Sequence, residues 1–109
     1  MVKQSQDHLD ALYGALADPT RRAMVARLRG GPLSVSDLGE PFGITLAAVG
    51  KHVAALEHAG IVRTHKSGRV RSCALVPNGL SDAAAWIQEH ERFWNARLDA
   101  LETHLEENP

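Results

Sequence analysis

Cysteine is nearly absent from this chain, because Cys73 is the only one in its 109 residues. A lone thiol forms no disulfide within the chain, which fits a reducing compartment. Long apolar runs are also missing, and no stretch approaches the roughly 18 residues that a membrane span requires. The first residues, 1–7, are polar and lack the apolar segment of a secretory signal. We therefore expect a cytoplasmic protein that does not enter a membrane.

Patterns that carry catalysis are missing as well. The sequence has no glycine-rich phosphate loop, no Ser/His/Asp or Cys/His set on a plausible scaffold, and no carboxylate pair expected in a cleft. We predict that the protein is not an enzyme, with no catalytic residues and no cofactor. The length and an apolar fraction of 44% fit one globular domain over residues 1–109.

Basic residues are concentrated in the middle of the chain, although the net charge is only −1. Residues 1–18 carry a charge of −2, residues 19–73 carry +6, and residues 74–109 carry −5. A basic centre between acidic ends can face phosphates while the ends face other surfaces. Taken alone, this distribution also fits solvated surface charges that happen to be unevenly distributed along the chain.

The first thirty residues predict two helices. Apolar residues at helical spacing indicate a helix over about 8–17, with Asp7 as its N-cap. Asp18 then caps a second helix, and Pro19 fits its first position, where the missing N–H costs nothing. One of the arginines that follow, Arg21 or Arg22, could contact phosphate or form an ion pair with Asp18 or Asp37.

The next segment, about residues 34–59, has the proportions of a helix-turn-helix unit. A short helix over about 35–40 is expected, capped by Ser34 or Ser36, and a turn follows at residues 42–43. Thr45 then caps a helix over about 46–59, which Gly60 ends. In such units the second helix lies in the DNA major groove, and its first residues contact base edges.

Two β-rich runs follow over about residues 61–66 and 70–76. The joining sequence Ser67-Gly68-Arg69 predicts a hairpin with arginines at its tip, which forms a wing over about residues 61–76. Cys73 lies in the second run and is expected to pack as a small apolar residue. A basic hairpin directly after a helix-turn-helix unit makes the winged helix-turn-helix pattern specific.

The last segment, about residues 78–107, predicts one long helix of about 45 Å. Its apolar residues alternate at spacings of four and three, as in a coiled-coil seam, and only Glu91 interrupts them. So long a helix needs a partner. Trp86, Phe93 and Trp94 could instead line a pocket for an aromatic inducer, although their spacing favours core and dimer interface.

The expected fold class is therefore mainly α (α+β). It is a winged helix-turn-helix with about five helices, a two-stranded β-hairpin wing and a long terminal dimerisation helix. The first helix, about residues 8–17, is expected to join the last in the dimer interface. The interface residues that we expect are Leu9, Leu12, Leu16, Ile87, Trp94, Leu98, Leu101 and Leu105.

Several segments together resemble the ArsR (arsenical-resistance type) family of winged-helix repressors. They are LADPTRR at residues 16–22, LSVSDL at 33–38, KHVAALEHAGIV at 51–62, and Phe93-Trp94 followed by Arg97 and Leu98. The resemblance covers about residues 8–105. It implies a homodimer that represses transcription at an inverted-repeat operator in double-stranded DNA, often its own promoter, until an inducer releases it.

The metal sites of that family do not carry over to this chain. The cysteines of the best-known site correspond to Ser34 and Ser36 here, and hydroxyls bind soft metals poorly. The other site needs a histidine two residues after Asp82, where Ala84 stands. We predict no metal. His8, His90 and His104 could still meet across a dimer and bind zinc or nickel, but solvent-facing or interface histidines are the favoured interpretation.

The expected DNA contacts come from the fourth helix and the wing. Leu46 and Ala47 suit thymine methyl groups, Lys51 suits guanine, and the wing arginines suit the minor groove or its phosphates. His52 is expected to donate to a phosphate or to pack under the wing. The predicted DNA-binding residues are Thr45, Leu46, Ala47, Gly50, Lys51, His52, Arg69 and Arg71.

Glycine is unusual inside a helix, so Gly50 has two explanations. One is a close approach of the backbone to DNA, and the other is tolerated drift. Together with Ala47, it leaves open a winged-helix module that binds protein rather than specific DNA. A second alternative is a metal-responsive repressor with a histidine site. The favoured prediction is a DNA-binding transcriptional regulator that acts as a homodimeric (auto)repressor.

Overall fold

The computed structural model describes residues 2–108 and consists mainly of helices. The helices are α1 (Val2–Leu16), α2 (Pro19–Leu28), α3 (Val35–Gly39), α4 (Leu46–His58) and α5 (Ser81–Glu107), with a 3₁₀ turn η1 (Glu40–Phe42). The strands are β1 (Leu33–Ser34), β2 (Val62–Ser67) and β3 (Val70–Leu75). This element order confirms the winged helix-turn-helix fold expected from the sequence.

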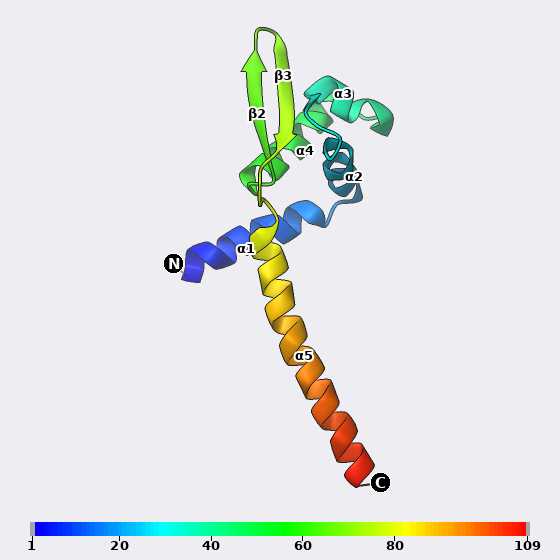
Figure 1. Cartoon of the computed structure of the whole chain (residues 1–109). Coiled ribbons are helices and arrows are strands. Elements are labelled where there is room, and N and C mark those ends of the chain that lie inside the picture. Colours follow the sequence, from blue (N-terminus) through cyan, green and yellow to red (C-terminus); the bar gives the residue numbers. More distant parts are fainter. Residues whose placement is uncertain (1, 109) are drawn as a thin grey trace.

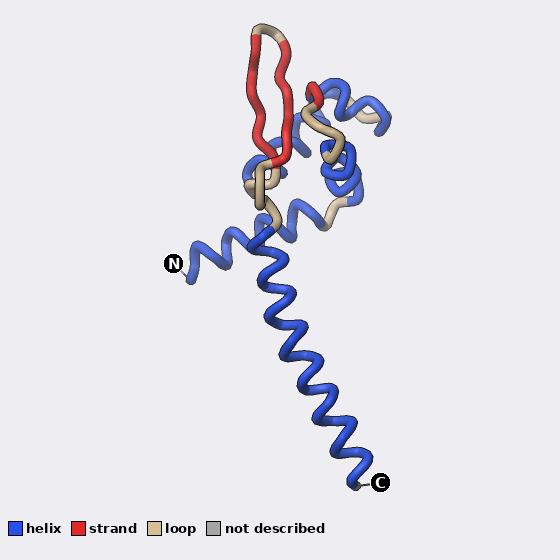
Figure 2. Tube along the Cα trace, viewed as in Figure 1, coloured by secondary structure: helices blue, strands red, loops and turns tan. Residues whose placement is uncertain are grey.

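The elements form a compact head with one long projection. Helices α1 to α4 make the head, and the β2–β3 hairpin extends from it on the side away from α5 (Figure 1). The molecule measures 69 × 33 × 22 Å, because α5 continues far beyond the head. Figure 2 shows that strand structure is confined to the hairpin and to a short segment beside it.

The core lies where α1, α2 and α4 meet the base of the hairpin. Leu12, Met24 and Leu56 are fully buried there, one from each helix. Cys73 of β3 is also fully buried, as the sequence predicted. Burial raises the pKa of its thiol to about 11, with a smaller contribution from the charge of Glu57. The cysteine is therefore a neutral packing residue.

Side-chain caps define the starts of three helices. The Asp18 carboxylate accepts a 2.9 Å hydrogen bond from the Arg21 amide at the start of α2. The Ser34 hydroxyl, rather than that of Ser36, caps α3, and the Thr45 hydroxyl caps α4. Such caps satisfy amide groups that have no partner within the helix.

Two helix starts differ from the expectations. Helix α1 begins at Val2, so Asp7 lies inside it and is not its N-cap. Neither proline nor glycine occurs before His8, and the polar residues there continue the helix. Helix α5 begins at Ser81 instead of residue 78. Asn78 has a left-handed φ of 61°, which is incompatible with a right-handed helix at that position.

The sheet has one strand more than the sequence predicted. Strand β1 pairs with β3, so the strand order is β1-β3-β2, with Leu33 opposite Cys73. A strand of two residues, the second of which is also the N-cap of α3, is too short to show an alternating pattern. The extra strand ties the start of α3 to the base of the wing.

Helix α5 touches the head only at its beginning. Ala83 is its only buried residue, and its carbonyl accepts a 2.7 Å hydrogen bond from the Tyr13 hydroxyl of α1. Nearby, the His8 ring lies 3.3 Å from the Asp82 carboxylate. Within residues 2–108 no helix combines the length and apolarity that crossing a membrane requires.

Candidate nucleic-acid interface

Helices α3 and α4 pack unusually closely, and Gly39 makes this possible. Gly39 is buried at the end of α3, and a Cβ there would overlap the methyl groups of Val49 on α4. Gly43 then turns the chain with a left-handed φ of 63°. The turn was predicted from the sequence but the contact was not, because nothing local distinguishes Gly39 from other glycines.

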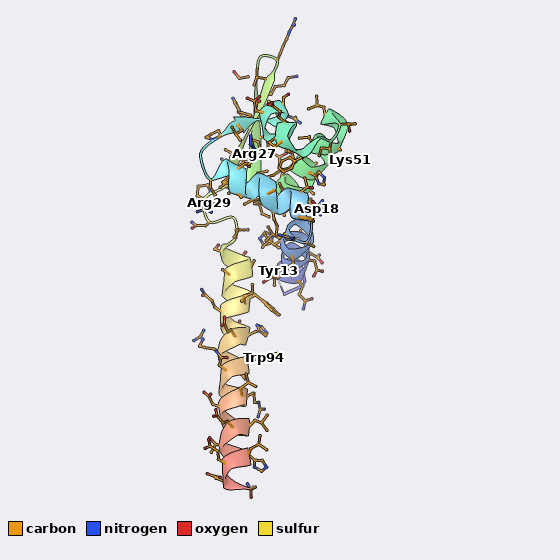
Figure 3. The ribbon with its side chains drawn as sticks, turned by 90° about the vertical axis from the view of Figure 1, so that its right-hand side faces the viewer. Tyr13, Asp18, Arg27, Arg29, Lys51 and Trp94 are labelled. Atoms are coloured by element: carbon orange, nitrogen blue, oxygen red, sulfur yellow. The ribbon has the colours of Figure 1, made fainter. Side chains whose placement is uncertain are left out.

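Helix α4 buries one face and exposes another. Val49, Val53 and Leu56 lie in the core. The opposite side of its first two turns is exposed, and the Leu46 residue there keeps 63% of its surface accessible to solvent. Figure 3 labels Lys51 on α4, well away from Trp94 on α5. The exposed residues of this face are Leu46, Ala47, Gly50 and Lys51.

Two other predicted contact residues on α4 have local partners within the chain. The hydroxyl of Thr45 accepts a 3.1 Å hydrogen bond from the Ala48 amide. The ring of His52 is half-buried, with Nδ1 lying 3.4 Å from a guanidinium nitrogen of Arg21 and 3.9 Å from the Asp18 carboxylate. The ring contacts the start of α2, so its position differs from that of the exposed residues.

No contact within the chain requires glycine at position 50. A Cβ built on Gly50 would have no atom within 4 Å. The packing explanation that holds for Gly39 therefore does not apply here. Close approach to DNA and tolerated drift are the two explanations that stay open.

The wing carries its charges on exposed positions. Gly68 adopts a left-handed φ of 62° in the two-residue turn, and Ser67 pairs with Val70 across it. Arg69 stands in this turn and Arg71 opens β3, and both are exposed. Two further exposed cations of β2, Arg63 and Lys66, were not selected from the sequence. Their position on a wing strand was the available signal.

Glu57 fixes the wing to α4. Its carboxylate accepts hydrogen bonds of 2.9 Å from both the amide and the hydroxyl of Thr64 on β2. Helix α4 and the first wing strand are therefore connected by a charged acceptor with two donors. This contact was not predicted, because Glu57 shares no motif with Thr64.

The arginines at the start of α2 cap the end of α1. Arg21 donates to the carbonyl oxygens of Ala15 and Gly14 at 2.8 and 3.0 Å. Arg22 donates to that of Leu16 at 2.7 Å. Neither guanidinium forms an ion pair with an aspartate in the described part of the chain, contrary to one expectation. Positive charge at a helix C-terminus complements the helix dipole.

The histidines considered for a metal site have separate partners within the chain. His8 contacts Asp82, the His90 ring stacks on Trp86 at a centroid distance of 4.0 Å, and His104 contacts Asn108. Within residues 2–108 no three histidine, cysteine or acidic side chains converge on one point. A site formed between two chains stays a prediction.

The predicted dimer interface is largely exposed in the single chain. Trp94 keeps 70% of its surface free, and Phe93 beside it keeps 72%. Leu12 differs, because it has no exposed surface and packs within the core of its own chain. Leu9 and Leu16 are partly buried against that core. The exposed members of the predicted interface are Ile87, Trp94, Leu98, Leu101 and Leu105.

Comparison with known proteins agrees with this geometry. A family model described as a helix-turn-helix domain matches residues 16–65. The HTH-type transcriptional regulator Rv2034 of Mycobacterium tuberculosis is 39% identical over 89 residues, which cover 82% of this chain and 80% of Rv2034. The transcriptional repressor SdpR of Bacillus subtilis is 28% identical over 79 residues, which cover 72% of this chain and 88% of SdpR.

A solved structure extends the agreement to three dimensions. The crystal structure of the ArsR family transcriptional regulator RHA00566 is 43% identical and gives a TM-score of 0.79. The match covers 83% of this chain and 93% of that one. These similarities are to regulators of transcription rather than to enzymes. The chain belongs to the ArsR family of winged helix-turn-helix transcriptional regulators.

Proposed function

We propose that this chain is a homodimeric repressor that binds an inverted-repeat operator in double-stranded DNA. Its own promoter is one expected target, and the cytoplasm is where it acts. The observation that carries the proposal is the pairing of an exposed α4 face with a basic wing. Glu57 and Thr64 hold these two elements together.

The chemistry of the two surfaces suits two kinds of contact. The exposed face of α4 is small and apolar apart from Lys51, which fits thymine methyl groups and a guanine edge in the major groove. Apart from the exposed Val70, the wing presents cations and polar groups around its turn, which fits phosphates and the minor groove. The proposed contact residues are Thr45, Leu46, Ala47, Gly50, Lys51, Arg69 and Arg71, with Arg63 and Lys66 added.

The exposed apolar residues of α5 support a second copy of the chain as partner. Contiguous exposed apolar surface of this extent is rare on a monomer and usually marks a protein interface. Ile87, Trp94 and Leu98 follow the spacing of a coiled-coil seam, and a second α5 has the matching pattern. The acidic end of the chain, −5 over residues 74–109, keeps this part away from DNA.

Selection of bound duplexes from a random-sequence DNA library tests the proposal. The expected result is an inverted repeat with half-site centres about one helical turn apart. Fluorescence anisotropy on the selected duplex should then show affinity falling steeply with salt, with a slope set by the phosphates contacted. Enrichment of no sequence, with binding equal to that of random DNA, would contradict the proposal and favour a protein-binding module.

A further inference from the structure

The corner between α1 and α2 touches the middle of α4 through three side chains. This corner cluster consists of Asp18, Arg21 and His52. Figure 3 shows Asp18 where α1 meets α2. His52 Nδ1 lies 3.4 Å from Arg21 Nη1 and 3.9 Å from Asp18 Oδ2.

Two members of the corner cluster, Asp18 and Arg21, are themselves held by hydrogen bonds to the backbone. Arg21 donates to the carbonyls of Gly14 and Ala15, so its guanidinium is held at the end of α1. Asp18 accepts from the Arg21 amide. This hydrogen bond lowers the pKa of Asp18, the charges of His52 and Arg21 lower it further, and desolvation opposes the shift. The carboxylate therefore stays charged.

The cluster adds direction to an otherwise apolar contact. Val49, Val53 and Leu56 attach α4 to the core, but apolar contacts have little directional preference. Hydrogen bonds weaken steeply when their angle is wrong, so contacts to Arg21 resist rotation of α4. The cluster thus connects α4 to α1, which is joined to α5 by Tyr13 and Ala83.

A small rotation of α4 would matter on DNA. A helix of 13 residues is about 20 Å long. A rotation of about 10° about one end displaces the other by about 3.5 Å, close to the rise of one base pair along a strand. In a dimer such a change would alter the separation of the two recognition helices.

We infer that His52 and Arg21 are positioning residues that fix the angle of α4 relative to α1 and so determine which half-site spacing the dimer accepts. This inference rests on the proposed function as a dimeric operator-binding protein. It assigns His52 to the orientation of the helix and leaves base contacts to the exposed residues of α4.

A library of operator duplexes with spacers varied one base pair at a time tests the inference. The wild-type protein should prefer one spacing sharply. His52→Ala should bind neighbouring spacings within about threefold of the best one, with its affinity for an isolated half-site changed less than threefold. His52→Asn keeps a polar atom near the Nδ1 position and should restore the sharp preference.

Two further variants keep the test decisive. His58→Ala removes an exposed histidine from the last turn of the same helix and should leave the spacing profile unchanged. If thermal unfolding shows that His52→Ala does not fold, Asp18→Asn replaces it, because asparagine also caps helices but lacks the carboxylate that lies 3.9 Å from His52 Nδ1. A smaller broadening of the profile is expected for Asp18→Asn.

The outcomes separate this inference from the proposed function. If wild-type protein selects no operator, the proposed function fails and the inference falls with it. If the wild type selects an operator but folded His52→Ala keeps the sharp profile, only the inference is overturned. A broad profile for His52→Asn as well would also overturn it, because the polar contact would then not be what orients α4.

Discussion

The Cβ that Gly39 lacks would occupy the space filled by the methyl groups of Val49. Helix α3 therefore approaches α4 more closely than any other residue at position 39 would allow. This contact sets the geometry of the helix-turn-helix unit, since it lies directly before the turn at Gly43.

Replacing Gly39 by alanine is expected to destabilise the protein by about 1–3 kcal/mol, the usual cost of overpacking a core. Gly39 has an ordinary helical backbone, with a φ of −85°, so the effect would be steric. Urea denaturation followed by circular dichroism measures it. DNA affinity should also fall, because relieving the overlap by moving α3 away from α4 would disturb the helix-turn-helix geometry.

Gly50→Ala is the matched control, since it makes the same change in an exposed helical position. Alanine there meets nothing within 4 Å and should raise the free energy of unfolding by up to about 1 kcal/mol. A loss of stability for Gly50→Ala, or none for Gly39→Ala, would contradict the assigned packing. The DNA affinity of Gly50→Ala also separates close approach, which predicts weaker binding, from tolerated drift.

Glu57→Ala should loosen the wing without unfolding the head. The variant leaves two donors of Thr64 without their acceptor, at an expected cost of about 1 kcal/mol for these exposed bonds. The Thr64 amide should exchange faster with solvent, and operator affinity should fall several-fold. Glu57→Gln is the control for charge, because the glutamine side-chain oxygen can still accept hydrogen bonds from Thr64. Equal exchange rates of the Thr64 amide in the two variants would argue against the contact between Glu57 and Thr64.

Stability should decline in alkaline solution because of Cys73. Burial holds its thiol pKa at about 11, above the 9.0 of an unperturbed thiol. Between these values the unfolded chain releases the proton and the folded chain keeps it, so the free energy of unfolding falls as pH rises. Urea denaturation at pH 8 and at pH 10.5 should show this decrease, and Cys73→Ala should show a smaller one.

The thiol should also be unreactive in the folded protein at pH 8. A chromogenic disulfide reagent should label Cys73 slowly in buffer and completely in denaturant, because the thiolate is the reactive form. Rapid stoichiometric labelling of the folded chain would show that the residue is not buried as described.

Lys51 and Arg69 are expected to act differently on DNA. Lys51→Ala should change the preferred base at one operator position, because lysine bound to a guanine edge contributes specificity. Arg69→Ala should weaken binding to all sequences alike and reduce the salt slope by about 1. Competition assays on a panel of operator variants measure both, and a uniform loss for Lys51→Ala would contradict its assigned role.

Local sequence signals predicted most of the fold. Asp18, Thr45 and Gly60 mark helix ends through backbone chemistry that depends only on their immediate neighbours. The signal for the hairpin was also local, because Gly68 supplies the left-handed residue that its turn needs. Strand β1 escaped notice because two residues carry no periodicity.

The contacts that connect these elements could not be predicted in the same way. An ion pair between an aspartate and Arg21 or Arg22 was one expectation, but Arg21 caps α1, which depends on how α1 and α2 are angled. Leu12 and Leu16 belong to one apolar stripe in the sequence, yet only Leu12 is fully buried. Periodicity identifies the apolar side of a helix and not which neighbour covers each residue.

Sedimentation equilibrium of the protein with its selected operator measures how many chains bind one duplex. We expect a complex of two chains per duplex, and a dimer at micromolar concentration without DNA. Leu98→Glu should abolish both, whereas Ala96→Glu, which adds the same charge on the other side of α5, should not. Single chains throughout, or one chain bound per operator, would contradict the proposed homodimeric repressor.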